Sequence, residues 1–139
     1  MNRKRFDILG LQVDAIGFQE AVRHVINSGK KRKTEYICFA NVHMTIEARN
    51  NKEFSVAVNN AGLVLADGAP IAKSFSWLYN TKQSRVAGMD FMPAIVDAAA
   101  KEKLTVFLFG TTEEMLAKIS QKIHRDYGPD LLAGYYSPP

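Results

Sequence analysis

Short apolar runs along the chain alternate with segments in which apolar residues recur at helical spacing. Three runs, at residues 36–40, 63–66 and 104–109, are rich in β-branched, aromatic or leucine side chains. Each is followed directly by a polar residue or a glycine. Apolar runs of this length, bounded by turn residues, are typical of buried strands. We therefore predict three strands at these positions.

Two further apolar segments, residues 6–9 and 11–14, flank Gly10 and predict a short N-terminal strand pair. A last strand is expected within residues 130–136. Between the strands, apolar residues three and four positions apart predict helices. The predicted helices cover residues 18–29, 44–51, 53–60, 71–79 and 89–101, and a segment that begins after Thr111 or Thr112.

This order of elements defines the expected fold class. Strands that alternate with helices form a parallel sheet with right-handed crossovers and helices on both faces. We therefore expect an α/β protein with a Rossmann-like open parallel sheet, preceded by the short N-terminal strand pair. A length of 139 residues and a hydrophobic content of 47% fit one domain, residues 1–139, that buries a real core.

The predicted sheet is incomplete after its last strand. Residues 137–139 follow that strand without a helix to cover it. A parallel sheet that lacks its later units has an exposed edge and an uncovered face. We expect a truncated chain, and the formation of a homo-oligomer is left open.

The apolar stretches are too short to cross a membrane, which needs about 20 apolar residues. The basic start, Arg3-Lys4-Arg5, has no apolar signal core behind it. We therefore expect a cytoplasmic protein. Its one cysteine, Cys38, lies inside a predicted strand, where the expected role is that of a small buried hydrophobic residue.

The net charge of +4 comes mainly from two basic clusters, residues 3–5 and 30–33. Such clusters are either solvated loops or contacts for nucleic acid or an anionic membrane surface. No aromatic residues interleave with them, and no recognition helix follows them. We therefore expect no nucleic-acid partner.

The candidate active site lies where the run at residues 63–66 ends in Asp67. Open α/β sheets bind ligands at the carboxyl ends of their strands. Asp67 is therefore a candidate general base, although an aspartate before Gly68-Ala69-Pro70 also suits a helix N-cap. Arg85 precedes a short turn and is a candidate phosphate ligand, with a surface ion pair as the alternative.

Other candidate residues stand at neighbouring strand ends. Asn41 suits either a contact with a polar ligand group or a turn or cap, and Gly110 and Thr111 form a strand-to-helix turn that favours an anion. His43 suits a ligand contact or a structural role. The histidines are not at metal-ligand spacing and no Asp-x-Asp pair is present, so we expect no metal and no other cofactor.

Five short motifs resemble those of the WecG/TagA/CpsF glycosyltransferases, also called glycosyltransferase family 26, in order and spacing. Each motif alone is weak, but the five together are specific and cover nearly the whole chain from about Ile8. The motifs are residues 39–43, 65–68, 85–90, 107–111 and 134–139.

The resemblance implies an inverting, metal-independent enzyme. It would move N-acetylmannosamine or a similar sugar from a UDP-sugar donor to an undecaprenyl-diphosphate-linked acceptor, in bacterial surface polysaccharide or teichoic acid synthesis. Peripheral contact with the inner face of the cytoplasmic membrane is implied as well. The alternative is a non-catalytic nucleotide-binding α/β module or an inactive remnant, because family members typically continue beyond the motif that ends this chain.

The resemblance also assigns roles to residues. Asp67 and Arg85 are the expected catalytic residues. The expected substrate-binding residues are those of the same motifs: Asn41, His43, Gly68, Gly88, Asp90, Gly110 and Thr111.

Overall fold

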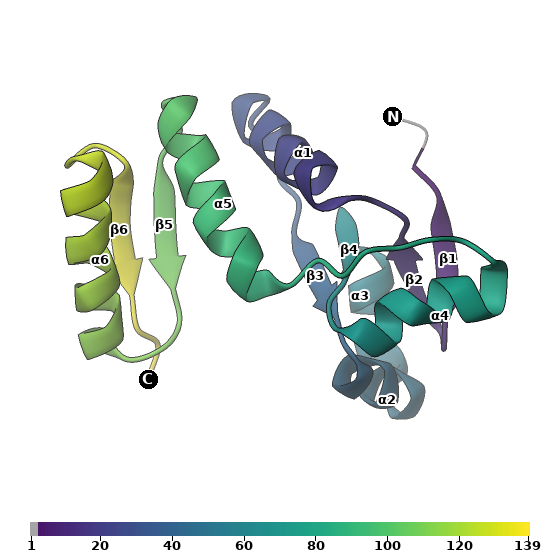
Figure 1. Ribbon diagram of the computed structural model, residues 1–139. Helices are drawn as coiled ribbons and strands as arrows, with labels where there is room; N and C mark the ends of the chain where they lie inside the picture. Colours follow the sequence, from purple (N-terminus) through teal and green to yellow (C-terminus); the bar gives the residue numbers. More distant parts are fainter. Residues whose placement is uncertain (1–2) are drawn as a thin grey trace. The chain divides into compact units, whose positions relative to one another are not determined.

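The computed structural model describes residues 3–139, in which strands and helices alternate (Figure 1). This confirms the α/β class. The chain divides into two compact units, one up to Met92 and one from Pro93 onward, and each is described by itself. Helix α5 (Gly88–Lys101) runs across the division. The single domain over residues 1–139 stays a prediction.

The first unit begins with the predicted antiparallel strand pair, β1 (Arg5–Ile8) and β2 (Leu11–Asp14). Leu9 and Gly10 form its turn with φ angles of 54° and 92°, the left-handed backbone that a two-residue hairpin turn requires. The Asp7 carboxylate accepts a hydrogen bond from the Gly10 N–H, which fixes the turn.

Helix α1 (Phe18–Lys30) leads to a parallel pair, β3 (Ile37–Ala40) and β4 (Leu63–Ala66). Two short helices, α2 (Val42–Asn50) and α3 (Lys52–Asn59), connect these strands. Both helices start at an asparagine whose side chain accepts a hydrogen bond from the backbone three residues on. Helix α4 (Ala69–Tyr79) then follows β4. These elements lie within a few residues of the predicted ones.

A buried carboxylate joins the hairpin to β4. Asp14 is fully buried and accepts hydrogen bonds from the Val64 N–H at 2.7 Å and from Arg5 Nε at 3.2 Å. Arg3 Nε lies 2.8 Å from the same carboxylate. Arg5 also donates to the carbonyl oxygen of Ala61. Two of the three basic residues at positions 3–5 therefore stabilise the fold instead of forming a solvated basic cluster.

The expected open sheet is replaced, among the described residues, by three two-stranded sheets. The free edge of β4 faces the hairpin, and there a side-chain oxygen of Asp14 accepts the bond that a neighbouring strand would accept in a continuous ladder. The third sheet lies wholly within the second unit. The predicted α/β class is confirmed, but the prediction of one continuous parallel sheet is wrong.

The core of the first unit gathers around β4 and the hairpin. Phe75 from α4 is its largest fully buried side chain, and Phe6 packs edge-on against it with ring centroids 5.4 Å apart. Cys38 packs partly buried against this cluster, and burial raises the pKa of its thiol. The thiol is therefore less reactive than a free one, in keeping with the expected structural role.

The second unit contains a strand–helix–strand motif. Strand β5 (Val106–Phe109), helix α6 (Glu113–Tyr127) and strand β6 (Leu132–Tyr136) follow one another, and the two strands are parallel (Figure 1). The Thr112 hydroxyl accepts a hydrogen bond from the Met115 N–H and caps α6, as one of the two predicted cap residues. No helix in the described residues is long and apolar enough to cross a membrane.

Candidate active site

Strand β4 carries Asp67 to the end of the parallel pair. All four residues of the strand are fully buried, and Asp67 follows them with its side chain 27% exposed. The Asp67 N–H donates to the Ala40 carbonyl oxygen at 2.9 Å, so the pairing with β3 extends one residue beyond the strand. The carboxylate therefore leaves a rigid backbone at the carboxyl edge, as predicted, and remains open to solvent.

Gly68 turns the chain from Asp67 into α4. Its φ of 98° and ψ of 143° suit glycine alone, and it occupies the N-cap position of the helix, which has no side-chain cap. Asp67 is therefore not the cap, and the alternative structural role considered for its carboxylate is not observed. Pro70 stands in the first turn, as expected.

Substituting Gly68 by alanine is expected to strain this turn. A Cβ at this position would meet only Pro70 Cδ, at 3.8 Å, so the cost arises from the backbone conformation and not from crowding. We expect the free energy of unfolding to fall by about 1–3 kcal/mol. Urea denaturation followed by circular dichroism measures this, with Gly17→Ala as the control at a glycine of negative φ. Equal losses in the two variants would contradict the explanation.

The segment before α5 places Arg85 beside Asp67. The Val86 N–H donates to the Ala66 carbonyl oxygen at 2.8 Å, and the Val86 side chain is fully buried. Upstream, the Gln83 amide bonds to both the N–H and the carbonyl oxygen of Ile16, at 3.1 and 2.8 Å. The segment that carries Arg85 is therefore hydrogen-bonded both to Ile16, just after the hairpin, and to Ala66 at the end of β4.

The two expected catalytic side chains meet. Arg85 Nε lies 4.0 Å from Asp67 Oδ1, and the Arg85 side chain is 51% exposed. This distance is too long for a hydrogen bond, so the pair is an open charge contact. Both side chains are partly exposed, and the longer distance separates this contact from a hydrogen-bonded ion pair such as Lys101 with Asp97 at 2.6 Å.

Asn41 ends the neighbouring strand, because Ala40 pairs with Ala66 in the sheet. Its side-chain oxygen accepts a hydrogen bond from the Met44 N–H at 2.9 Å and caps α2, as in the capping alternative. The cap uses the oxygen only, so the amide N–H groups remain donors for a ligand. His43 is exposed in the first turn of the same helix.

Gly88 and Asp90 lie in the first turn of α5. Phe91 anchors this turn by packing its ring edge-on against Phe18 and Phe39. A Cβ on Gly88 would stand 3.6 Å from the Phe39 ring, an ordinary contact, so packing does not require a glycine there. Asp90 is exposed, and its charge suits a helix N-terminus. Substrate-binding roles for both residues stay predictions.

Gly110 and Thr111 belong to the second unit. Their φ angles of 113° and 55° form a left-handed turn between β5 and α6, and the Ser137 hydroxyl donates to the Thr111 carbonyl oxygen at 2.6 Å. The C-terminal motif therefore contacts the motif at residues 107–111. Their assignment to an anion site stays a prediction.

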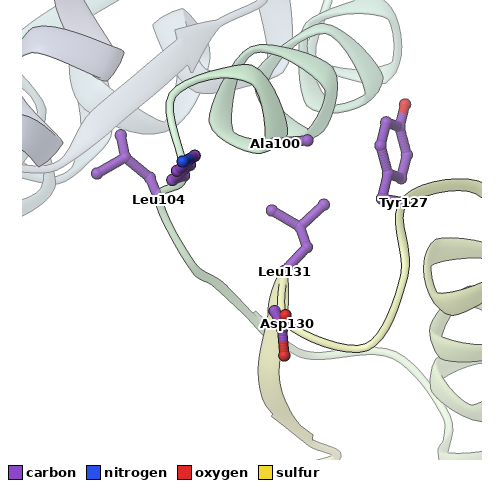
Figure 2. Close-up of a pocket in the computed structure, with 6 residues that line it drawn as sticks. Ala100, Leu104, Tyr127, Asp130 and Leu131 are labelled. Atoms are coloured by element: carbon purple, nitrogen blue, oxygen red, sulfur yellow. The ribbon is translucent and has the colours of Figure 1, made fainter.

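Two cavities lie elsewhere, and neither includes Asp67 or Arg85 among its lining residues. One, of about 400 Å³, opens in the second unit before β5 and β6 begin, with Tyr127 and Leu131 turned toward it (Figure 2). Ligands of α/β folds bind at the opposite strand ends, so this cavity is not the candidate site. The other, of about 300 Å³, lies along α1.

Sequence reasoning missed the residues that hold the site in place. Gln83 and Ile16 are 67 positions apart, and Val64 and Asp14 are 50 apart. No local pattern connects residues at such distances. The only signal in the sequence was Asp14 at the end of a predicted strand, and the sequence does not tell whether such a carboxylate is buried or exposed.

In residues 3–139, no three His, Cys, Asp or Glu side chains are grouped to hold a metal ion.

The chain is an α/β protein with a carboxylate and a guanidinium near each other at a strand end, and the comparisons name its family. The family described as "Glycosyl transferase WecG/TagA/CpsF family" matches residues 6–139, and the chain belongs to it. This confirms the predicted resemblance.

One curated relative comes from Bacillus spizizenii (strain ATCC 23059 / NRRL B-14472 / W23). It is named N-acetylglucosaminyldiphosphoundecaprenol N-acetyl-beta-D-mannosaminyltransferase, and it is 28% identical over 105 residues. The matched segment covers 76% of this chain and 41% of the relative. The chain therefore spans less than half the length of this relative.

Proposed function

We propose that the chain carries the catalytic core of an inverting glycosyltransferase. The donor is a UDP-sugar, with N-acetylmannosamine or a similar sugar, and the acceptor is a sugar linked to undecaprenyl diphosphate. The observation that carries the proposal is the open contact of Asp67 with Arg85 at the carboxyl edge of β4. The family membership and the printed name of the Bacillus spizizenii relative support the substrate classes.

The proposed reaction is a single displacement. The acceptor hydroxyl oxygen attacks the anomeric carbon, while Asp67 takes the hydroxyl proton. The bond from the anomeric carbon to the diphosphate oxygen breaks, and UDP leaves with the electron pair. One attack from the face opposite the leaving group inverts the anomeric centre, and only one carboxylate is required.

Arg85 is proposed to stabilise the departing diphosphate. A guanidinium presents a planar fork of donors that matches two phosphate oxygens, and its charge opposes the charge that develops on the leaving group. The Asn41 amide at the neighbouring strand end would orient a sugar hydroxyl. In this scheme the guanidinium and backbone donors perform the task that a divalent cation performs in many sugar transferases.

The test is sugar transfer by the purified chain. UDP-N-acetylmannosamine and a lipid-linked acceptor analogue with a short, water-soluble tail should give UDP and a longer acceptor, which chromatography and mass spectrometry detect. UDP binding without transfer, measured by calorimetry, would instead favour the non-catalytic nucleotide-binding module. Absence of both binding and transfer would identify an inactive remnant.

Replacing Arg85 by glutamine is expected to lower kcat about 10²-fold, because one preorganised charge on the leaving group is lost. Arg85→Lys keeps the charge but not the fork, so we expect partial recovery. Arg49→Gln, an exposed arginine near the end of α2, is the matched control. Steady-state kinetics of each variant measure kcat and KM. Equal rates for Arg85→Gln and the control would refute the role of Arg85 in the reaction.

A further inference from the structure

Helix α4 presents an apolar group directly away from the core. Its buried residues, Ile71, Ala72 and Phe75, define the inward face. Trp77 lies two positions after Phe75, a rotation of about 200°, and therefore points outward. Its side chain is 73% exposed, and that of its neighbour Leu78 is 58% exposed. Leu78 lies about 100° around the helix from Trp77, and exposed large apolar side chains of this kind are typical of contact surfaces.

The same stretch of chain is positively charged. Between Gly68 and Met89 the sequence contains three basic residues and no acidic one. Lys73 stands one turn before Trp77 on the outward face, and Lys82 is exposed in the segment after the helix. The third basic residue is Arg85 of the candidate site. We call the exposed residues Lys73, Trp77, Leu78 and Lys82 the α4 surface.

The α4 surface lies on the helix that follows the candidate site and on the segment after it. Helix α4 starts two residues after Asp67 and has 11 residues, a length of about 16 Å. The relative named above is an enzyme whose acceptor carries an undecaprenol lipid. A site that works on such an acceptor must operate within reach of a lipid surface.

We propose that the α4 surface docks on a bilayer that contains anionic lipid. Trp77 and Leu78 enter the headgroup region, where tryptophan is favoured because its ring is apolar and its N–H is polar. Lys73 and Lys82 contact lipid phosphates. The reason for the docking rests on the proposed function, but the binding itself does not depend on catalysis.

Charge favours the bilayer over a second copy of the chain. Two copies joined by this surface about a two-fold axis would bring the same positively charged patch of each copy, which contains Lys73 and Lys82, against the other. The segment from Gly68 to Met89 offers no acidic partner for them. An anionic lipid surface neutralises all of these charges together.

Trp77 is the only tryptophan of the chain, so its fluorescence reports on this surface alone. Addition of phosphatidylglycerol–phosphatidylcholine vesicles should shift the emission to shorter wavelength, and brominated lipid should quench it. Vesicles of phosphatidylcholine alone should have a much smaller effect. An emission unchanged by anionic vesicles would overturn the proposal. A shift that depends on protein concentration without lipid would indicate self-association instead.

Variants assign the binding to individual residues. Vesicle flotation of Trp77→Ser should show binding weaker by roughly tenfold, since an aromatic side chain contributes apolar area. Lys73→Glu and Lys82→Glu should each weaken it at least about fivefold. Lys52→Glu, an exposed lysine at the start of α3, and Val56→Ser, a half-exposed valine on that helix, are matched controls. Equal losses in the controls would contradict the assignment.

An activity measurement separates this proposal from the proposed function. Trp77→Ser should transfer sugar to an acceptor with a short, soluble tail at the parent rate and to a vesicle-embedded acceptor at a reduced rate. A parent chain that binds vesicles but transfers nothing would refute the function and leave the docking intact. Transfer by the parent chain with no vesicle binding would support the function and refute the docking.

Discussion

Asp67→Asn is expected to lower kcat for sugar transfer about 10³-fold, within the range of 10² to 10⁴ typical of a general base. Asparagine keeps the size and one oxygen of the side chain but cannot accept the acceptor proton. Because Asp67 does not cap α4, and Gly68 holds the N-cap position, the fold should be unchanged. The loss should therefore be in kcat, with little change in the affinity for UDP.

The design of this experiment follows from the geometry. Glu47→Gln, at an exposed position on α2, removes a carboxylate charge from the same unit and should leave kcat unchanged. Thermal unfolding by circular dichroism checks that the Asp67→Asn variant folds like the parent chain. If Asp67→Asn had the same kcat as Glu47→Gln, Asp67 would not be the general base. Another carboxylate would then have to accept the proton.

Asp14→Ala is expected to lower the free energy of unfolding by about 3–5 kcal/mol, the cost of breaking a buried ion pair from one side. Asp14 is fully buried, and its removal leaves the Val64 N–H and the Arg5 guanidinium without this partner. Burial of an unpaired donor carries a penalty that the new methyl group does not compensate.

Urea denaturation of the parent and variant chains measures this loss. Asp14→Asn should be intermediate, because the amide oxygen still accepts from Val64 while the charge facing the arginines is gone. Asp7→Ala removes an exposed carboxylate from the same hairpin, so we expect a loss of about 1 kcal/mol or less. A loss in Asp14→Ala as small as that in Asp7→Ala would show that the buried carboxylate contributes little.

Local chemistry made much of the fold predictable. The apolar run Leu63–Ala66 is the observed strand, residue for residue, and the proline after Asp67-Gly68 does mark the start of α4. The contact of Asp67 with Arg85 was also expected, because both were assigned to one strand edge. The strand and the helix start depend on positions a few residues apart, and the contact was expected from the strand edge to which both residues were assigned.

Other features depend on which distant partner a polar group finds. The sequence presents Asp14 as an ordinary strand end and Arg3 and Arg5 as a basic cluster, yet the three meet in one buried network. The expectation of a single open sheet was wrong for a related reason. Periodicity identifies strands, but it does not determine whether a backbone ladder or a side chain links neighbouring ones.

Residues 14–16 support both halves of the candidate site. Asp14 bonds to β4, the strand that ends at Asp67, and Ile16 bonds to Gln83, two residues before Arg85. Together with the bond from the Val86 N–H to the Ala66 carbonyl oxygen, this tripeptide holds the two segments that carry Asp67 and Arg85. One short link between the hairpin and α1 thus braces the backbone on both sides of the candidate site.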